Sequence, residues 1–364
     1  MTGPLLELAG ALTSGPMTDA VFAGDAKAQG MSVVWSRLHP SEMFWRQLRF
    51  SEFDVSEMSM SSLLISIDRG DDSWVGIPVF TTREFFHTWT LVRSDAGVES
   101  PSDLAGKRVG VPEYQQTAAV WARGALQHEF GVSPTDAEWF MERPPGRSHG
   151  GATGFVPPDG VRLSYLGVET DIGTAMLSGE LDATLLYLRE PNLVDRSRVD
   201  LEADARVRPL FTDRLGEGRR YYRATGFLPV NHTVVVRREL AERHPWVVLN
   251  LYDMFVDAKR SFVERVRSCV EPWSRLGLLG GAEEAMRVDP RPYGIRAPTG
   301  SSTKPTRLQP SPVTPTSRVS RPGRFQSGRF SLPAPSSCEK ALGPYRSREV
   351  GARPLASLVA TEMV

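Results

Sequence analysis

The chain has 364 residues, enough for two domains of ordinary size, and its 40% hydrophobic and 24% charged residues are typical of globular proteins. It carries 43 basic and 43 acidic residues, but residues 296–364 hold 11 basic and 3 acidic ones, which leaves 32 basic against 40 acidic residues before them. This acidic excess argues against nucleic acid as the main partner.

The chain shows no signal for export or for a membrane. Its first residues lack a basic start, and Glu7 interrupts their apolar run, so they do not resemble a secretory signal. No apolar run approaches the roughly 18 residues of a membrane span. The two cysteines, Cys269 and Cys338, have neither a disulfide framework nor a metal-site spacing. We therefore expect a cytoplasmic protein with no membrane partner.

Hydrophobic periodicity and turn residues predict alternating strands and helices along the chain. The predicted strands are 5–12, 31–38, 53–55, 75–80, 88–93, 108–111, 161–166 and 183–188. The predicted helices are 18–28, one from Pro40, 59–67, one from 113–117 to 130, 171–178 and 246–266. The Gly- and Pro-rich loop 143–160 is expected to be mobile, and the chain returns to its first part through 221–236. This alternation predicts an α/β fold.

Five sequence motifs, in order, resemble the 4,5-dihydroxyphthalate decarboxylase family over about residues 5–295. The motifs are EFDVSEMSMSS (52–62), VPEYQQTAAVW (111–121), MLSGELDA (176–183), NHTVVVRRELAERHPW (231–246) and DPRPYG (289–294). The resemblance implies a two-lobed type II periplasmic-binding-protein-like architecture with a cleft between the lobes. It also implies lobe one at 1–92, lobe two at 93–225 and a return to lobe one at 226–295.

The same resemblance implies cofactor-independent, non-oxidative decarboxylation of a hydroxylated aromatic dicarboxylate, with carbon dioxide released. Two helix starts, at 59–62 and 113–117, would face each other across the cleft and offer N–H groups and hydroxyls to carboxylates. A ligand with two negative groups, such as a phthalate, suits this pair. Capping of a helix remains the simpler role for any single serine.

Candidate site residues follow from the motifs and from residue chemistry. His87 and His232, at strand ends, are the candidate proton donors, and a glutamate is the alternative acid. Arginine grips carboxylates with two parallel hydrogen bonds. The candidate catalytic residues are His87, His232 and Glu113. The candidate substrate-binding residues are Arg83, Ser59, Ser61, Glu57, Tyr114, Thr117, Arg223 and Arg46.

Other readings stay open at the level of sequence. The histidines lack metal-site spacing, so we expect neither a metal nor a cofactor. A non-catalytic solute-binding protein of the ABC-transporter type is the main alternative, and an enzyme akin to thiamine-pyrimidine synthesis proteins is another, although no matching motif is visible. Relatives place a Tyr-Asp-Arg cluster after the first strand, whereas this chain has residues 11–14, ALTS, which puts phthalate specificity in doubt. Whether the chain forms a homo-oligomer is left open.

The composition changes after Ile295. Residues 296–364 contain ten prolines, many serines and few apolar side chains, which predicts a disordered tail. Because the change directly follows a motif, we favour a shifted reading frame over a genuine lineage-specific tail.

Overall fold

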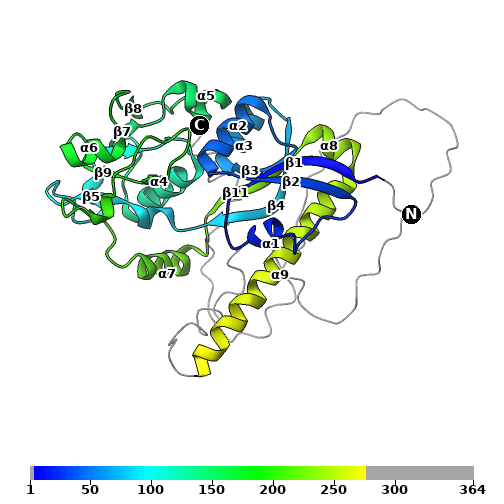
Figure 1. The fold of residues 1–364 in the computed structure, drawn as a ribbon. Helices are drawn as coiled ribbons and strands as arrows, with labels where there is room; N and C mark the ends of the chain where they lie inside the picture. Colours follow the sequence, from blue (N-terminus) through cyan, green and yellow to red (C-terminus); the bar gives the residue numbers. More distant parts are fainter. Residues whose placement is uncertain (1–3, 276–364) are drawn as a thin grey trace, which may run out of the picture. The chain divides into compact units, whose positions relative to one another are not determined.

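The computed structural model describes residues 4–275, together with the side chains up to Val266 and that of Ser268. The predicted tail at 296–364 and the DPRPYG motif lie outside the described residues. Two β-sheets form the framework, with strand orders β2-β1-β3-β11-β4 and β10-β5-β9-β6-β7-β8. The chain passes from the first sheet to the second between β4 and β5, and returns between β10 and β11 (Figure 1). The predicted α/β architecture of two lobes joined by two crossings is therefore confirmed.

The first sheet is built from five strands of lobe one. They are β1 Leu6–Leu12, β2 Met31–Arg37, β3 Val55–Ser59, β4 Trp74–Arg83 and β11 Val230–Arg237. Strands β1, β2 and β3 run parallel, while β11 is inserted antiparallel to both β3 and β4. The strand that arrives last in the sequence thus occupies an inner place in the sheet.

Helices cover both faces of this sheet (Figure 1). They are α1 Asp19–Phe22, α2 Pro40–Phe50, α3 Met60–Asp68, α8 Arg238–Arg243 and α9 Pro245–Arg275. Side chains that alternate along a strand pack to opposite faces. Val234 and Val236 of β11 accordingly join the core formed with α1 and α9, whereas Val235 joins the core formed with α3.

The second sheet forms lobe two. Its strands are β5 Leu91–Arg93, β6 Arg108–Val111, β7 Glu138–Met141, β8 Arg162–Tyr165, β9 Ala183–Thr184 and β10 Val207–Pro209. Its helices are α4 Thr117–Phe130, α5 His149–Thr153, α6 Ile172–Ser178 and α7 Arg214–Thr225, with short 3₁₀ turns η1 Phe86–Trp89, η2 Pro101–Leu104, η3 Pro145–Arg147 and η4 Leu201–Ala203. Helices α4 and α6 pack in separate cores, with Trp139 and Met141 of β7 beside α4 and Phe140 beside α6.

Several predicted elements differ from the structure. The helix expected over 18–28 is only α1, because Gly24 has a φ of +76° and ends it. The strands expected at 88–93 and 183–188 are shorter, since η1 precedes β5 and β9 ends at Thr184. Strand β7 was not predicted. The segment 143–160, expected to be a mobile loop, contains α5 and buries Arg143, Ser148 and His149.

Candidate active site

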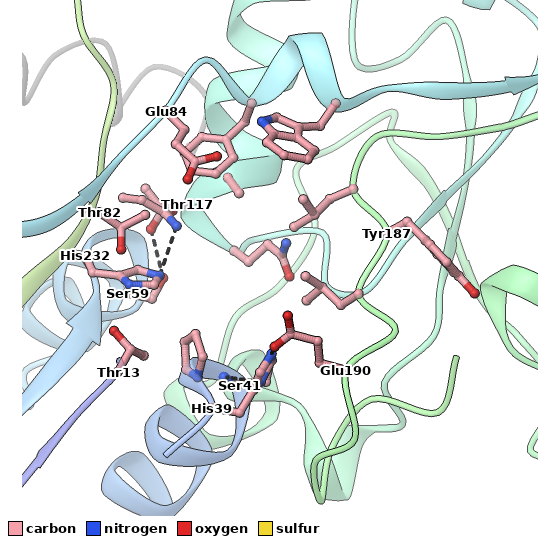
Figure 2. Close-up of a pocket in the computed structure, with 18 of the residues that line it drawn as sticks. Thr13, His39, Ser41, Ser59, Thr82, Glu84, Thr117, Tyr187, Glu190 and His232 are labelled. Atoms are coloured by element: carbon pink, nitrogen blue, oxygen red, sulfur yellow. Dashed lines mark hydrogen bonds and ion pairs between the residues drawn. The ribbon is translucent and has the colours of Figure 1, made fainter. Parts of the chain in front are cut away.

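A cavity of about 620 Å³ is lined by residues of both lobes (Figure 2). Thr13, Ser59 and His232 belong to lobe one, and Gln116, Thr117 and the segment 186–190 belong to lobe two. Its volume falls within the range of about 300–1,000 Å³ that is usual for small-molecule sites. Phe44, Phe86, Trp89, Leu186 and Leu188 provide apolar walls suited to an aromatic ring.

The parallel strands explain why these residues meet. Thr13 follows β1, Ser59 ends β3, Thr117 begins the helix after β6, and Arg143 follows β7. Carboxyl ends of parallel strands share one edge of a sheet, and open α/β sheets bind ligands at that edge. The cavity therefore lies where the topology of each lobe places loops and helix starts.

His232 and Glu57 form a buried acid–base pair on the cavity wall. His232 Nδ1 lies 3.2 Å from Glu57 Oε2, and the Asn231 amide nitrogen lies 2.9 Å from His232 Nε2. The pair spans neighbouring strands, because His232 on β11 is opposite Ser59 on β3. His232 lines the cavity, whereas Glu57 is fully buried behind it. Both ring nitrogens are therefore engaged, Nδ1 with the Glu57 carboxylate and Nε2 with the Asn231 amide, while the His232 side chain lines the cavity.

Hydrogen bonds hold Glu57 in its ionised form. Burial alone would raise the pKa of its carboxyl group, but bonds from His232, Thr81 and Thr13 outweigh burial and lower that pKa. Thr13 donates its backbone N–H at 2.8 Å and its hydroxyl at 2.7 Å, and the Thr81 hydroxyl donates at 2.6 Å. A carboxylate so fixed stabilises the positive charge of a protonated imidazole.

The two helix starts predicted to face each other across a cleft instead contact each other. The Ser61 backbone N–H donates to the Thr117 hydroxyl at 2.9 Å, and the Ser61 hydroxyl donates to the Gln115 carbonyl at 2.6 Å. The hydroxyls of Ser59 and Thr117 are 2.8 Å apart. Ser59 and Thr117 line the cavity, but Ser61 is not among its lining residues. The starts of α3 and α4 thus bind each other across the lobes, and the predicted open pair of anion sites is wrong in this respect.

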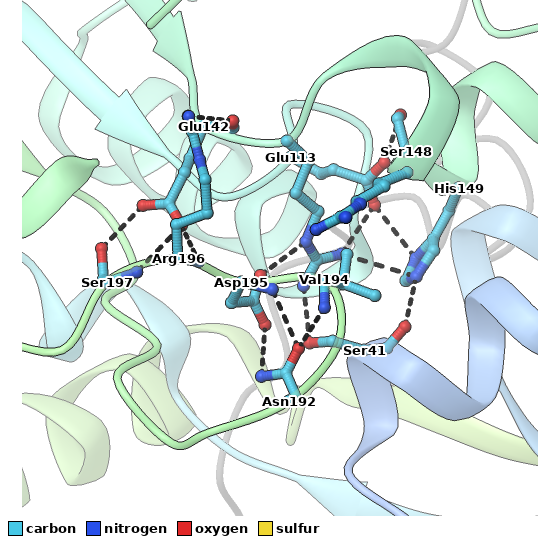
Figure 3. A network of polar contacts seen from close by, with 12 residues as sticks. Ser41, Glu113, Glu142, Ser148, His149, Asn192, Val194, Asp195, Arg196 and Ser197 are labelled. Atoms are coloured by element: carbon cyan, nitrogen blue, oxygen red, sulfur yellow. Dashed lines mark hydrogen bonds and ion pairs between the residues drawn. The ribbon is translucent and has the colours of Figure 1, made fainter. Parts of the chain in front are cut away.

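A buried ionic network lies beside the cavity (Figure 3). Arg143 contacts Glu113 at 2.9 Å, Asp195 at 2.6 Å and the Ser41 hydroxyl at 2.6 Å. His149 lies 3.0 Å from Glu113 through Nδ1 and 2.9 Å from the Ser41 carbonyl oxygen through Nε2. Ser41 is in α2 of lobe one, so the network connects the two lobes.

Charge pairing sets the pKa values in this network. Burial favours the neutral form of Glu113, but the charges of His149 and Arg143 outweigh burial and hold its pKa far below the usual range. Burial also opposes ionisation of Asp195, yet Arg143 lowers the pKa of that carboxyl group. The Arg143 charge is thus balanced by two carboxylates.

Besides Glu57 and Ser61, six further predicted site residues do not line the cavity. Glu113 lies in the ionic network, where its ionised state does not suit a proton donor. Tyr114 is in the core of lobe two under Arg123. Arg83 donates to the Leu228 carbonyl, Arg46 pairs with Glu42 and Glu52, and Arg223 is exposed on α7.

His87 is the sixth of these residues. It is buried beside Tyr221 and Phe211, and its Nε2 lies 3.0 Å from Glu217. Burial lowers the pKa of His87. Its surroundings are those of a core histidine that joins η1 to α7.

Several cavity residues were not predicted as site residues, namely Thr13, Ser14, His39, Ser41, Phe44, Glu84, Arg143, His149, Tyr187, Glu190 and Asn231. Thr13 and Ser14 follow the first strand, a position that topology alone marks as functional. Asn231 directly precedes His232. Arg143 and His149 carried no such signal, because their Gly- and Pro-rich loop was expected to be mobile.

Residues 4–275 contain neither a membrane-spanning helix nor a group of side chains suited to a metal ion. No helix there is long and apolar enough to cross a membrane. In the same range, no three or more His, Cys, Asp or Glu side chains are grouped so that they could hold a metal ion.

The chain is similar in sequence to known proteins. No protein-family model matches the chain. A 4,5-dihydroxyphthalate decarboxylase of Comamonas testosteroni is 33% identical over 243 residues, which cover 67% of this chain and 72% of that protein. A protein of the same name from Pseudomonas putida is 33% identical over 208 residues, covering 56% of this chain and 76% of its own length.

Among solved structures, the periplasmic aliphatic sulphonate binding protein SsuA of Escherichia coli has a TM-score of 0.45 and 13% identity, covering 78% of this chain and 84% of its own. The identity to the Comamonas protein extends over more than two thirds of both chains. The chain therefore belongs to the 4,5-dihydroxyphthalate decarboxylase family.

Proposed function

We propose that the chain is a carboxy-lyase that removes a carboxylate from a hydroxylated aromatic dicarboxylate of the 4,5-dihydroxyphthalate type. The observation that carries the proposal is the Glu57–His232 pair on the wall of a cavity with aromatic and aliphatic sides. Family membership supports the same reaction, because the two relatives are named 4,5-dihydroxyphthalate decarboxylases.

In the proposed reaction, His232 in its protonated form donates a proton to the ring carbon that bears the departing carboxylate. The carbon–carbon bond then breaks, its electron pair returns to the ring, and carbon dioxide leaves. Glu57 stabilises the charged imidazole before the transfer. For the transfer, the Nε2–H group exchanges its contact with the Asn231 amide for the substrate carbon, while Nδ1–H keeps its contact with Glu57. A positioned acid of this kind contributes about 10²–10⁴-fold to a rate.

The second carboxylate of the substrate needs donors away from Glu84, which would repel it. Ser14 and His39 also line the cavity, and Figure 2 places His39 on the side opposite Glu84. We assign the spectator carboxylate to this end. Arg83, Arg46 and Arg223 are not assigned to it, since none of them lines the cavity.

The reaction is tested by incubating the purified protein with 4,5-dihydroxyphthalate and following carbon dioxide and protocatechuate. We expect both products in equal amounts, without added cofactor. Saturable binding of the substrate with no product would instead favour the solute-binding alternative.

The proposal includes a cytoplasmic place in the breakdown of phthalate-type compounds. The support is the cysteine content, since two cysteines without a disulfide framework suit a reducing compartment. Fractionation of cells with antibody detection tests it, and recovery of the protein outside the cytoplasmic fraction would count against this part alone.

A further inference from the structure

Four carboxylates line the cavity, and one of them stands apart. The four are Glu84, Glu190, Asp200 and Glu202. Three lie near basic side chains, in the pairs Glu190 with His39 at 3.7 Å, Asp200 with Arg189 at 2.5 Å and Glu202 with Arg214 at 2.7 Å. No ion pair to Glu84 is found among residues 4–275. Glu84 is therefore the carboxylate in this lining that is left to interact with a ligand.

The surroundings of Glu84 suit contact with an aromatic ring that carries a hydroxyl group. It directly follows β4, and Phe86 and Trp89 of the next turn line the same cavity. Glu84 is exposed to solvent, but the surrounding protein desolvates its carboxyl group and raises its pKa, and the charge of His232 and a hydrogen bond with the Trp89 side chain oppose that rise only in part. A carboxylate with a raised pKa is a stronger proton acceptor, closer to a phenol. A ligand hydroxyl would supply a second donor to this carboxylate.

Glu84 and His232 are placed so that one aromatic ring of a substrate could contact both, one at each end of the ring. Thr82 on β4 pairs with His232 on β11, and Glu84 lies two residues further along the chain. Figure 2 shows Glu84 and His232 on the same side of the cavity with Thr82 between them. A ring lying along this wall would present one edge to each side chain.

We propose, building on the decarboxylase function above, that Glu84 is a catalytic residue that accepts the proton of the ring hydroxyl para to the departing carboxylate. Glu84 would then select substrates that carry this hydroxyl. The inference goes beyond the acid–base pair, because it assigns the proton acceptor as well as the donor.

The step balances without an oxidant, a reductant or a co-reactant. Glu84 takes the hydroxyl proton, and the electron pair on oxygen moves into the ring, so that the para carbon accepts a proton from His232. The bond to the carboxylate breaks, its electron pair restores the aromatic ring, and carbon dioxide departs. Glu84 returns its proton to the ring oxygen. The one proton consumed reaches the ring through His232 from solvent.

The kinetic test uses Glu84→Gln, which preserves size but cannot accept a proton. We expect kcat for 4,5-dihydroxyphthalate to fall about 10²–10⁴-fold, with a smaller change in KM. Glu84→Asp, which keeps the carboxylate, should recover part of the loss. The acidic limb of the pH profile of kcat should be present in the wild type and absent in Glu84→Gln. Glu180→Gln, on the exposed surface, is the control and should retain the wild-type kcat.

A binding arm separates this inference from the proposed function. Calorimetry compares 4,5-dihydroxyphthalate with phthalate, which lacks both hydroxyls. The wild type should prefer the hydroxylated ligand, and Glu84→Gln should lose that preference. If the wild type shows no turnover, the proposed function fails, and the binding comparison still decides whether Glu84 recognises the hydroxyl. Wild-type kcat in Glu84→Gln, or an unchanged preference for the hydroxylated ligand, overturns the inference.

Discussion

His232 and His87 are both buried histidines beside a glutamate, yet their surroundings give them different roles. His232 lines the cavity and contacts Glu57, whereas His87 packs between aromatic side chains and contacts Glu217. Only a side chain that reaches the substrate can transfer a proton to it. We therefore expect a substitution of His232 to lower the reaction rate and a substitution of His87 to lower the stability of the fold.

Replacing His232 with Asn should lower kcat for 4,5-dihydroxyphthalate by about 10²–10⁴-fold, because the proton donor is lost in the transition state. Binding measured by calorimetry should change far less, since the carboxylate contacts form already in the ground state. A variant that loses binding and turnover together would contradict a role confined to proton transfer.

Replacing His87 with Gln is the matched change outside the cavity. It should leave kcat of the folded enzyme near the wild-type value and lower the free energy of unfolding by about 1–3 kcal/mol, because the buried partner Glu217 loses its contact. Urea unfolding and steady-state kinetics on the same sample test both halves. A large loss of kcat with unchanged stability would return His87 to the list of proton donors.

Arg143 is the residue whose loss should cost most stability. Arg143→Met leaves Glu113 and Asp195 buried without their cation, which destabilises proteins by about 3–5 kcal/mol. The exposed pair of Arg206 and Asp204 supplies the control, since Arg206→Met should cost about 0–1 kcal/mol. Urea unfolding at pH 7 compares the two, and equal losses would show that the network contributes little.

The same network predicts the effect of acid on stability. Glu113 and Asp195 have lowered pKa values in the folded protein. Their contribution is therefore complete above their unfolded pKa values of about 4 and is lost as the pH falls toward the folded ones. The free energy of unfolding of the wild type should fall below about pH 4, and Arg143→Met should show a shallower fall. If the unfolding free energies of the wild type and of Arg143→Met fell in parallel with pH, the ionic network would not be the cause of the acid sensitivity.

Single residues also show which parts of the site could be predicted from the sequence. His232 was found because it lies in a motif on a strand, and Thr117 because it begins a helix after a strand. The direction of His87 was not predictable, since a 3₁₀ turn follows β4 and local pattern does not fix where its side chain points. Arg143 was missed because its partner Glu113 is 30 residues earlier and becomes a neighbour only when β7 pairs with β6.

At the scale of elements, the starts of α3 and α4 were predicted from the sequence, whereas the contact between them is seen only in the structure. The helix starts were predicted from serine and threonine positions, but their mutual hydrogen bonds depend on the packing of two lobes. Long strands such as β1 and β2 followed from their patterns. Short ones such as β7 and β10 did not, because pairing with neighbours defines them more than their own residues do.

Thr117→Val should weaken this contact without changing side-chain shape. The buried Ser61 N–H would lose its acceptor, so the free energy of unfolding should fall by about 1–3 kcal/mol. The control is Thr135→Val, at a partly exposed hydroxyl in a turn, which should cost less. Equal losses of unfolding free energy in the two variants, measured by urea unfolding, would mean that the bond between the lobes contributes no more to stability than a hydrogen bond in a surface turn.

For the whole molecule, a cavity lined by both lobes predicts that a ligand stabilises them together. At a concentration about 100 times its Kd, 4,5-dihydroxyphthalate should add about 2.7 kcal/mol to the free energy of unfolding. Urea unfolding followed by tryptophan fluorescence tests this, because tryptophans lie in both lobes. Two transitions, of which only one shifts with ligand, would contradict binding between the lobes.

The place of β11 has a consequence for how the protein is made. This strand lies between β3 and β4, but it is synthesised after every strand of lobe two. On the ribosome, β1 to β4 must therefore wait with an inner place of their sheet unfilled while lobe two emerges and folds. Because His232 lies on β11, the nascent chain has its proposed proton donor in place only when that sheet is completed. The folding of lobe one and the formation of the proposed active site are thus completed in the same step.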